Sequence, residues 1–290
     1  MRTATYRSTA NPAYFSTGHV RYRGSQSAYP YPQGDEPSPR HNSAEGRRSR
    51  EPPALRHDEG TGVRRLPIRP DQLPARLRHV RWIGGGSGAG KSTVAGRLAA
   101  EHGLHLYHCD ETISEHARRS NPTDDPLLHA FMAMDMDERW VNRSPEEMLA
   151  TFHGFQGEGF DMILEDLLAL PEDPPILVEG FKPLPRLVAP LLSFADQAVW
   201  LVPTPAFRRF ALQSRGSTWA IAGKTGDPER ALANLLLRDH LFTEQVCREA
   251  AALHLRVIGV DGTLSIAELT RRVAEGVGLG PGRRQAGRKS

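Results

Sequence analysis

The 290-residue sequence has only two cysteines, Cys109 and Cys247, which excludes a fold built on a disulfide framework and fits a reducing compartment. It also lacks any uncharged apolar run near the roughly 18–20 residues that a membrane-spanning helix needs. Residues 1–20 contain no apolar core of a secretory signal. We therefore predict a soluble, cytoplasmic protein with no membrane partner.

Acidic residues are scarce at both ends of the chain. The formal charge is +7 for residues 1–80 and +4 for residues 279–290, but −8 for the segment between them. The isoelectric point of about 9.0 is thus a property of the flanks, and no specific nucleic-acid partner is predicted. Residues 1–78 also hold 10 of the 23 prolines and few branched aliphatic side chains. Such segments bury too little apolar surface to offset their ordering entropy, so we predict disordered tails at 1–78 and 279–290.

Between these flanks, short apolar stretches alternate with helical patterns. The expected strands are 79–85, 104–110, 175–180, 198–203 and 255–262, and a mostly helical insertion spans about 122–170. Alternation of this kind predicts an α/β domain over 79–278, with a parallel sheet covered by helices on both faces. All strands then end at one edge of the sheet, where ligands of open α/β folds bind.

The strongest signal in the sequence is a glycine loop that matches G-x-x-x-x-G-K-[ST] at every position, between a predicted strand and a predicted helix. It comprises Gly85, Gly86, Ser87, Gly88, Ala89, Gly90, Lys91 and Ser92, and is followed by Thr93. Glycines allow the backbone to wrap phosphate oxygens closely, and the helix N-terminus adds positive potential. Lys91 is expected to reach the β- and γ-phosphates, and Ser92 to offer its hydroxyl to Mg²⁺.

Carboxylates follow two of the predicted strands. Asp110 ends the stretch 104–110, where it can accept a proton from an acceptor hydroxyl, hold Mg²⁺ through water, or simply cap the next helix. Glu111 is the weaker candidate for the same role. Glu179 ends the apolar stretch 175–180, the position at which a carboxylate reaches the metal ion or its bound water.

Arginines are the expected source of further positive charge. Arg208, Arg209 and Arg215 lie on or just after the helix predicted at 204–215, ahead of a lid expected at about 214–228. A guanidinium near the glycine loop would neutralise charge on a transferring phosphoryl group, and Arg215 is favoured because it borders the lid.

Outside this edge the signals are weaker. Arg238 is a less favoured lid residue, and Arg139 or Arg143 of the insertion would hold an anionic group of an acceptor unless they belong to a solvated helix face. His105 and His108 point to opposite sides of a strand, so no metal site is expected there.

Taken together, the glycine loop, Asp110, the ILVEG stretch and the arginine-bearing helix resemble the P-loop nucleoside/nucleotide-kinase-like superfamily. This group includes shikimate, gluconate, uridine and nucleoside monophosphate kinases, together with related antibiotic phosphotransferases. The resemblance implies a three-layer P-loop NTPase fold with strand order 2-3-1-4-5 and a lid. It also implies Asp110 as base or metal partner and Arg208, Arg209 and Arg215 as lid arginines.

The sequence therefore predicts an ATP- and Mg²⁺-dependent phosphotransferase acting on a hydroxyl of a small molecule, with Lys91, Asp110 and Arg215 catalytic. Ser92 and Glu179 are the expected metal ligands. The protein is expected to be a monomer or a homodimer. The alternative is a nucleotide-dependent switch or regulatory ATPase that acts through a protein partner.

Overall fold

The computed structural model describes residues 64, 66, 68–215 and 217–280, and the side chains at 212–219 are outside this description. The described chain contains a five-stranded, fully parallel sheet in the order β2-β3-β1-β4-β5. Its strands are β1 (Val80–Gly85), β2 (His105–His108), β3 (Ile176–Glu179), β4 (Ala198–Pro203) and β5 (Val257–Val260). The predicted α/β class, the parallel sheet and its strand order are confirmed.

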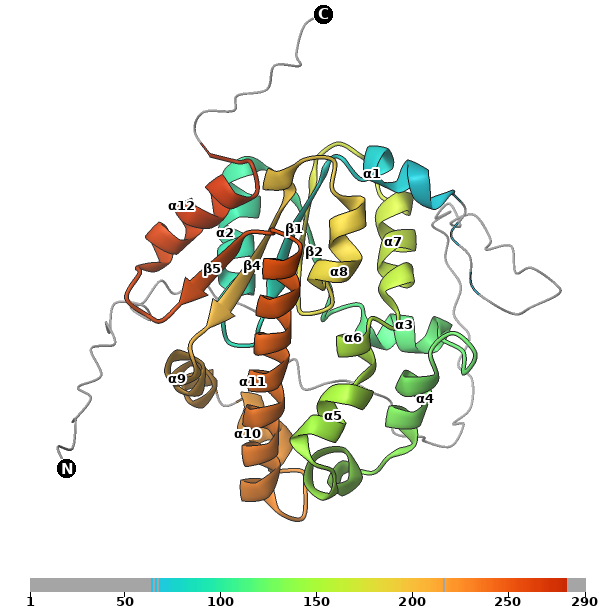
Figure 1. Ribbon diagram of the computed structural model, residues 1–290, viewed down its shortest axis with the longest axis vertical. Helices are drawn as coiled ribbons and strands as arrows, with labels where there is room; N and C mark the ends of the chain where they lie inside the picture. The colour runs from blue at the N-terminus through green and yellow to red at the C-terminus, as the bar shows by residue number, and fades with distance from the viewer. Residues whose placement is uncertain (1–63, 65, 67, 216, 281–290) are drawn as a thin grey trace, which may run out of the picture.

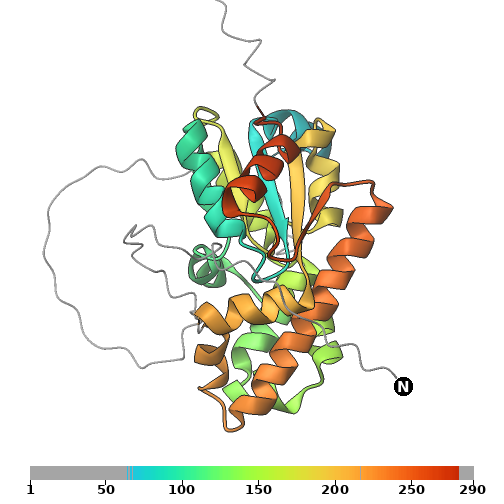
Figure 2. The same ribbon diagram turned by 90° about the vertical axis from the view of Figure 1, so that its left-hand side faces the viewer.

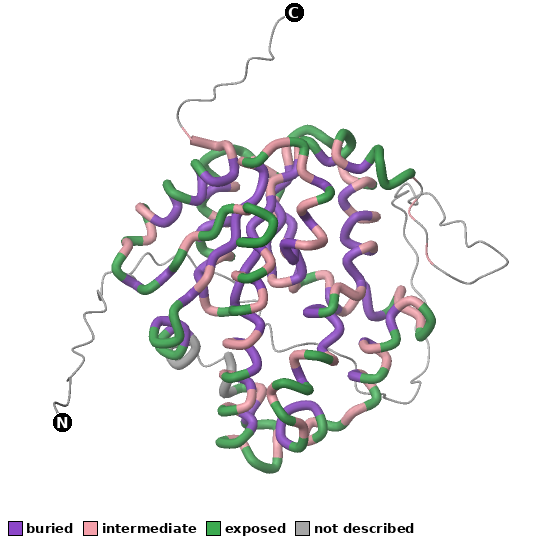
Figure 3. The backbone as a smooth tube through the Cα atoms, in the orientation of Figure 1, coloured by how far each residue is buried: buried purple, intermediate pink, exposed green. Residues whose placement is uncertain are grey.

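Helices cover both faces of the sheet (Figure 1). The helices α2 (Lys91–His102) and α12 (Ile266–Gly276) lie on one face, and α7 (Phe160–Ala169), α8 (Pro185–Val188) and α11 (Pro228–Ala252) lie on the other. Alternate strand residues enter opposite cores: Trp82 and Trp200 pack toward α7, α8 and α11, whereas Ile83 packs toward α2 and α12. Figure 3 shows that burial is concentrated in the central strands β1, β3 and β4 and on the inner sides of the helices.

The carboxyl edge of the sheet faces a helical lobe formed largely by the predicted insertion (Figures 1 and 2). This lobe contains α3 (Ile113–Arg119), α4 (Pro126–Ala133), a π-helical turn at Glu138–Asn142, α5 (Pro145–Thr151) and α6 (His153–Gln156). Two elements after β4, α9 (Pro205–Arg215) and α10 (Ser217–Ala222), complete it. The long α11 runs from the lobe back to the sheet and packs on both.

The expected lid is only partly an irregular break. Residues 217–222 form α10, because Ala222 is fully buried and Ile221 packs against the core, which stabilises a helical turn there. The irregular part is confined to residues 223–227, where Gly226 N donates to Asp137 Oδ1 at 2.7 Å.

Several residues ahead of β1 are part of the folded unit. After a 3₁₀ turn at Pro70–Gln72, the helix α1 (Leu73–Arg76) buries Leu73, and Leu66 and Ile68 pack on the same core. The side chain of Arg64 reaches the lobe, with Nη2 3.1 Å from Asp125 Oδ2 and Nη1 2.8 Å from Asp161 Oδ2. The predicted tail at 1–78 otherwise lies outside the described residues, as do residues 281–290.

In the part of the chain that the structure describes, no helix combines the length and the apolar character required to cross a membrane.

Candidate functional site

The glycine loop lies between β1 and α2 at the carboxyl edge of the sheet. Gly85, Gly88 and Gly90 have φ angles of 120°, 77° and 81°, which side-chain-bearing residues rarely adopt. Left-handed glycines spaced in this way turn backbone N–H groups toward one side and create an anion-binding concavity. Ser87 at the tip of the loop is exposed, as are Ser92 and Thr93 in the first turn of α2.

The loop is held from behind by close packing, which leaves no room for a side chain at Gly86. A Cβ on Gly86 would lie 2.6 Å from Thr243 Oγ1, and a Cβ on Gly88 would lie 3.4 Å from Arg208 Cγ. The backbone N–H of Gly86 donates to the Leu201 carbonyl at 3.0 Å. Lys91 Nζ donates to the Gly86 carbonyl at 2.9 Å, which folds the ammonium group back over the loop. These contacts fix the loop at the end of β1.

Glu179 ends β3 next to the glycine loop and is 3% exposed. Its Oε1 lies 2.7 Å from His108 Nδ1, which donates when protonated at that nitrogen. Burial alone would raise the pKa of Glu179, but the hydrogen bond from His108, the charge of Lys91 and the Ser92 hydroxyl hold it below its usual value. Glu179 is therefore an ionised carboxylate beside Lys91 and Ser92, and its role as a metal ligand stays a prediction. His108, paired across the β2–β3 register, was not predicted.

Asp110 lies on the same edge, just after β2. Its Oδ1 is buried and accepts no hydrogen bond within the described part of the chain. Burial, followed by the charge of Glu179, raises its pKa to about 6, although Lys91 and Lys182 lower it. A carboxyl group with a pKa near neutrality and an uncommitted oxygen is suited to accept a proton. Glu111, by contrast, is exposed.

Of the two predicted arginines whose side chains the structure describes, Arg208 and Arg209, Arg208 is the one placed against the loop. It is 3% exposed, and its Nη2 lies 3.2 Å from Asp239 Oδ2 of α11. Burial, and then the neighbouring charge of Arg238, lower the pKa of Arg208 to about 10. Arg209 is exposed on the same helix. The side chain of Arg215 lies outside the described residues.

Arg238 is a buried companion to Arg208. It is 2% exposed, shares Asp239 by donating from Nε at 2.9 Å, and lies over the rings of Trp140, Phe152 and Phe155 at about 5 Å from each centroid. Both arginines thus contact the same carboxylate, that of Asp239, which links α9 to α11 beside the loop.

The arginines expected to bind an acceptor from within the insertion have structural partners. Arg139 donates to the carbonyls of Phe131 and Met132 at 3.0 and 2.9 Å, and Arg143 donates to the Glu138 carbonyl at 3.0 Å. These bonds close the turns between α4 and α5, so neither arginine is directed at the sheet edge for binding.

Lys182, which was not predicted, is a buried cation near Asp110. It follows β3 by three residues and is 4% exposed. A Cβ on Gly159 would lie 3.5 Å from Lys182 Nζ and 4.0 Å from Asp125 Oδ1, so the ammonium group and this carboxylate lie at the same end of α7. Burial lowers its pKa, against the charges of Cys109, Asp110 and Asp125. The local sequence at 181–183, Phe-Lys-Pro, does not predict a buried lysine, because the burial of Lys182 results from the packing of the lobe.

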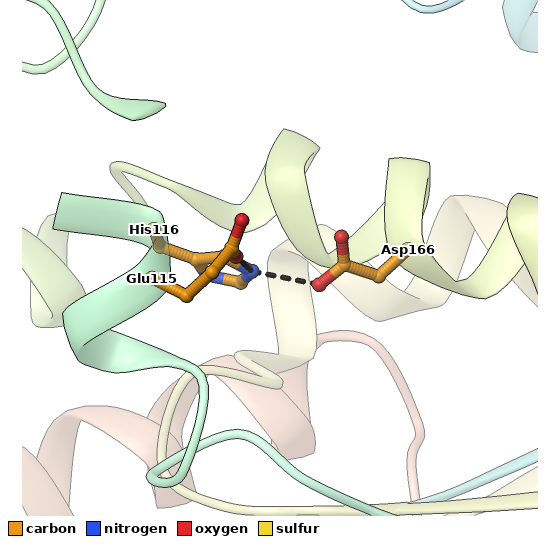
Figure 4. Close-up of side chains that lie close together, drawn as sticks. All are labelled: Glu115, His116 and Asp166. Carbon is orange, nitrogen blue, oxygen red and sulfur yellow. Dashed lines mark hydrogen bonds and ion pairs between the residues drawn. The ribbon is translucent and has the colours of Figure 1, made fainter. Parts of the chain in front are cut away.

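A histidine–carboxylate cluster elsewhere in the lobe is a structural network (Figure 4). His116 Nε2 lies 2.8 Å from Asp166 Oδ2 and 3.8 Å from Glu115 Oε2. Asp166 also accepts from Tyr107 at 2.6 Å and from Arg119 at 2.9 Å, and Arg119 contacts Glu115 at 3.2 Å. Because Arg119 pairs with both carboxylates and His116 bonds to Asp166, we interpret the cluster as a network that ties α3 to α7.

A cavity of about 510 Å³ lies behind the glycine loop, between the ends of β4 and β5 and the middle of α11. Pro203 and Thr243, which pack on Gly86, separate it from the loop. It contains neither Asp110 nor Glu179 and is distinct from the candidate site.

No protein-family model matches the chain, and a search of curated proteins found no significant relative. The functional argument therefore rests on the geometry of the site.

Proposed function

We propose that this protein is a P-loop kinase that transfers the γ-phosphate of ATP to a hydroxyl group of a small molecule. The observation that carries the proposal is the convergence of Lys91, Ser92, Glu179 and Asp110 at one edge of the sheet, with Arg208 packed against the loop. An anion-binding loop supports nucleotide binding, and a carboxyl group with a raised pKa supports proton transfer.

The oxygen donors at this edge suit Mg²⁺, which prefers carboxylates and hydroxyls and retains several waters. Glu179 is ionised and adjacent to the Ser92 hydroxyl, so these residues would hold the ion directly or through its water. When bound, Mg²⁺ neutralises charge on the β- and γ-phosphate oxygens.

The residues at this edge have separate roles in the proposed reaction. Lys91 and the loop amides hold the phosphates, and Arg208 offsets charge that develops on the transferring group. Asp110 takes the proton of the acceptor hydroxyl. At the same time the hydroxyl oxygen forms a bond to the γ-phosphorus, and the bond between that phosphorus and the β,γ-bridging oxygen breaks. The products are ADP and a phosphate monoester, and the proton remains on Asp110 until it exchanges with water.

The test is ATP consumption by the full chain with Mg²⁺, measured alone and with a panel of metabolites, nucleosides and natural products. The full chain is required because Leu66, Ile68 and α1 pack on the core. We expect one compound class to raise turnover many-fold and Lys91→Ala to abolish it. Tight ATP binding, with slow turnover that no small molecule stimulates, would refute the kinase proposal in favour of a regulatory ATPase.

A further inference from the structure

His108 and Glu179 lie directly opposite each other in the sheet, as Cα partners in the parallel register of β2 with β3. Side chains at paired positions of neighbouring strands lie on the same face of a sheet. Leu177, the alternate residue of β3, packs on the face that α2 covers, so Glu179 and His108 point to this face as well. The helix α2 begins there with Lys91 and Ser92. His108 therefore lies at the same edge as the proposed nucleotide site.

The backbone around Glu179 is held by hydrogen bonds to both neighbouring strands. The N–H of Cys109 donates to the Glu179 carbonyl at 3.0 Å, and the N–H of Gly180 donates to the Ile83 carbonyl at 3.2 Å. A Cβ on Gly180 would lie 2.7 Å from Cys109 Cβ, so the chain segments that follow β2 and β3 approach closely. The remaining freedom of Glu179 is in its side chain, whose rotamers place the carboxylate at different points along the sheet edge.

The hydrogen bond with His108 restricts this side-chain freedom. His108 Nδ1 lies 2.7 Å from Glu179 Oε1, and the two side chains are 25% and 4% exposed. Because an ionised carboxylate can only accept, Nδ1 carries the hydrogen and donates it. A bond to Oε1 leaves the lone pairs of Oε2 for a metal ion or for one of its bound waters.

His108 differs from the other polar neighbours of Glu179. Lys91 and Ser92 also lie beside this carboxylate, but they belong to the glycine loop and to the first turn of α2. Both are proposed to contact the phosphates and Mg²⁺ themselves. His108 comes from a strand and stands outside that set, so its hydrogen bond can hold Glu179 while the nucleotide and the ion are bound.

We propose that His108 is a positioning residue, whose Nδ1–H group holds the Glu179 carboxylate in the orientation that binds Mg²⁺ or its water. This inference rests on the proposed function, because it concerns the ion of the Mg·ATP complex. Hydrogen bonds to metal-ligating side chains orient the ligand, and their loss typically lowers metal affinity by about 10–100-fold. His108 therefore supports nucleotide binding that depends on Mg²⁺ and has no part in binding without the ion.

The first experiment measures binding of a fluorescent, non-hydrolysable ATP analogue to the full chain as free Mg²⁺ is varied, with EDTA as the metal-free reference. We expect His108→Leu to raise the Mg²⁺ concentration for half-maximal enhancement of binding by about 10–100-fold. His108→Asn should stay close to the wild type, since the asparagine amide nitrogen can take the position of Nδ1. The matched control is His105→Leu, at the exposed start of the same strand.

An unchanged Mg²⁺ dependence in His108→Leu, or an equal loss in His108→Asn, would overturn the proposal. His108→Gln, whose amide group lies farther from the backbone, replaces His108→Leu if that variant does not fold, and the same loss is expected of it.

The second experiment asks whether His108 acts through Glu179. In a double-mutant cycle, His108→Leu should cause no further change in Mg²⁺ dependence once Glu179→Gln is present. Additive effects of the two substitutions would show that His108 acts independently, which would contradict this inference and leave the kinase proposal intact. A wild type that does not bind the analogue at any Mg²⁺ concentration would instead refute the proposed function itself.

Discussion

Replacing Asp110 by asparagine should make the protein more stable and inactive. The raised pKa of Asp110 means that the folded state favours its neutral form, so asparagine, which is neutral at every pH, avoids the cost of the buried charge. The pKa rises from 3.8 to about 6, roughly two units at 1.36 kcal/mol each, which gives a ceiling of about 3 kcal/mol. Because the residue is partly exposed and water screens the charge, we expect a gain of about 1–2 kcal/mol.

The sign of this effect depends on pH. Below the unfolded-state pKa of 3.8 the carboxyl group is neutral in both states, so the wild type and Asp110→Asn should be equally stable. As the pH rises through about 6, the wild type loses the stability that its protonated carboxyl provided. Urea unfolding at about pH 4 and about pH 8 measures the difference, with the exposed Asp71→Asn as control. A gain that is equal at both pH values, or a loss at the higher one, would refute the reasoning.

The same ionisation should govern catalysis. If Asp110 is the base, kcat/KM for the acceptor should rise with pH with a midpoint near 6, since this parameter reports the free enzyme. Asp110→Asn should lower the rate by about 10²–10⁴-fold. A profile that is flat from about pH 5 to about pH 8 would exclude this role.

Three further substitutions test the proposed metal ligand Glu179, the ion pair of Arg64 and the glycine loop. Glu179→Gln should weaken Mg²⁺-dependent nucleotide binding by roughly tenfold to a hundredfold, measured by titration with and without EDTA; binding without Mg²⁺ should persist, and an unchanged Mg²⁺ dependence would remove Glu179 from the metal site. Arg64→Ala should lower the free energy of unfolding by about 3 kcal/mol, because it leaves buried Asp125 unpaired; a change as small as that of the exposed Arg69→Ala would refute the importance of this ion pair. Gly85→Ala should destabilise the fold by more than about 3 kcal/mol, since its Cβ would clash with the Leu201 carbonyl at a positive φ; a wild-type melting temperature would show that the loop relaxes freely.

Local patterns were sufficient to predict the parallel sheet and the residues at the strand ends, whereas the strand order came from the family resemblance. Glu179 ends an apolar strand, and the residues of the glycine loop are consecutive in the sequence. Both positions could therefore be predicted from local sequence alone. Which arginine of α9 faces the loop did not follow, because Arg208 and Arg209 are adjacent and the choice depends on how the helix packs against α11.

Two residues that the sequence did not predict, His108 and Lys182, depend on contacts with elements far away in the chain. His108 becomes a partner of Glu179 through the register of β2 with β3, and Lys182 becomes buried only when α7 closes over the loop after β3. Neither stands in a recognisable motif. The sequence left open whether Arg139 and Arg143 bind an acceptor or lie on a helix face; in the structure they donate to backbone carbonyls of their own turns.

The continuous helix α11 sets a fixed spacing between the glycine loop and the aromatic rings of the lobe. Thr243 on this helix touches the glycine loop, and Arg238, five residues earlier, lies over the aromatic rings of the lobe. At 1.5 Å per residue they are separated by about 7.5 Å along the axis. The helix thus fixes the distance between the glycine loop and the aromatic cluster of the lobe. A single residue inserted between Thr243 and Arg238 would turn Arg238 by about 100° around the helix axis. It would change the position of Arg238 relative to the glycine loop without disturbing the loop or the lobe themselves.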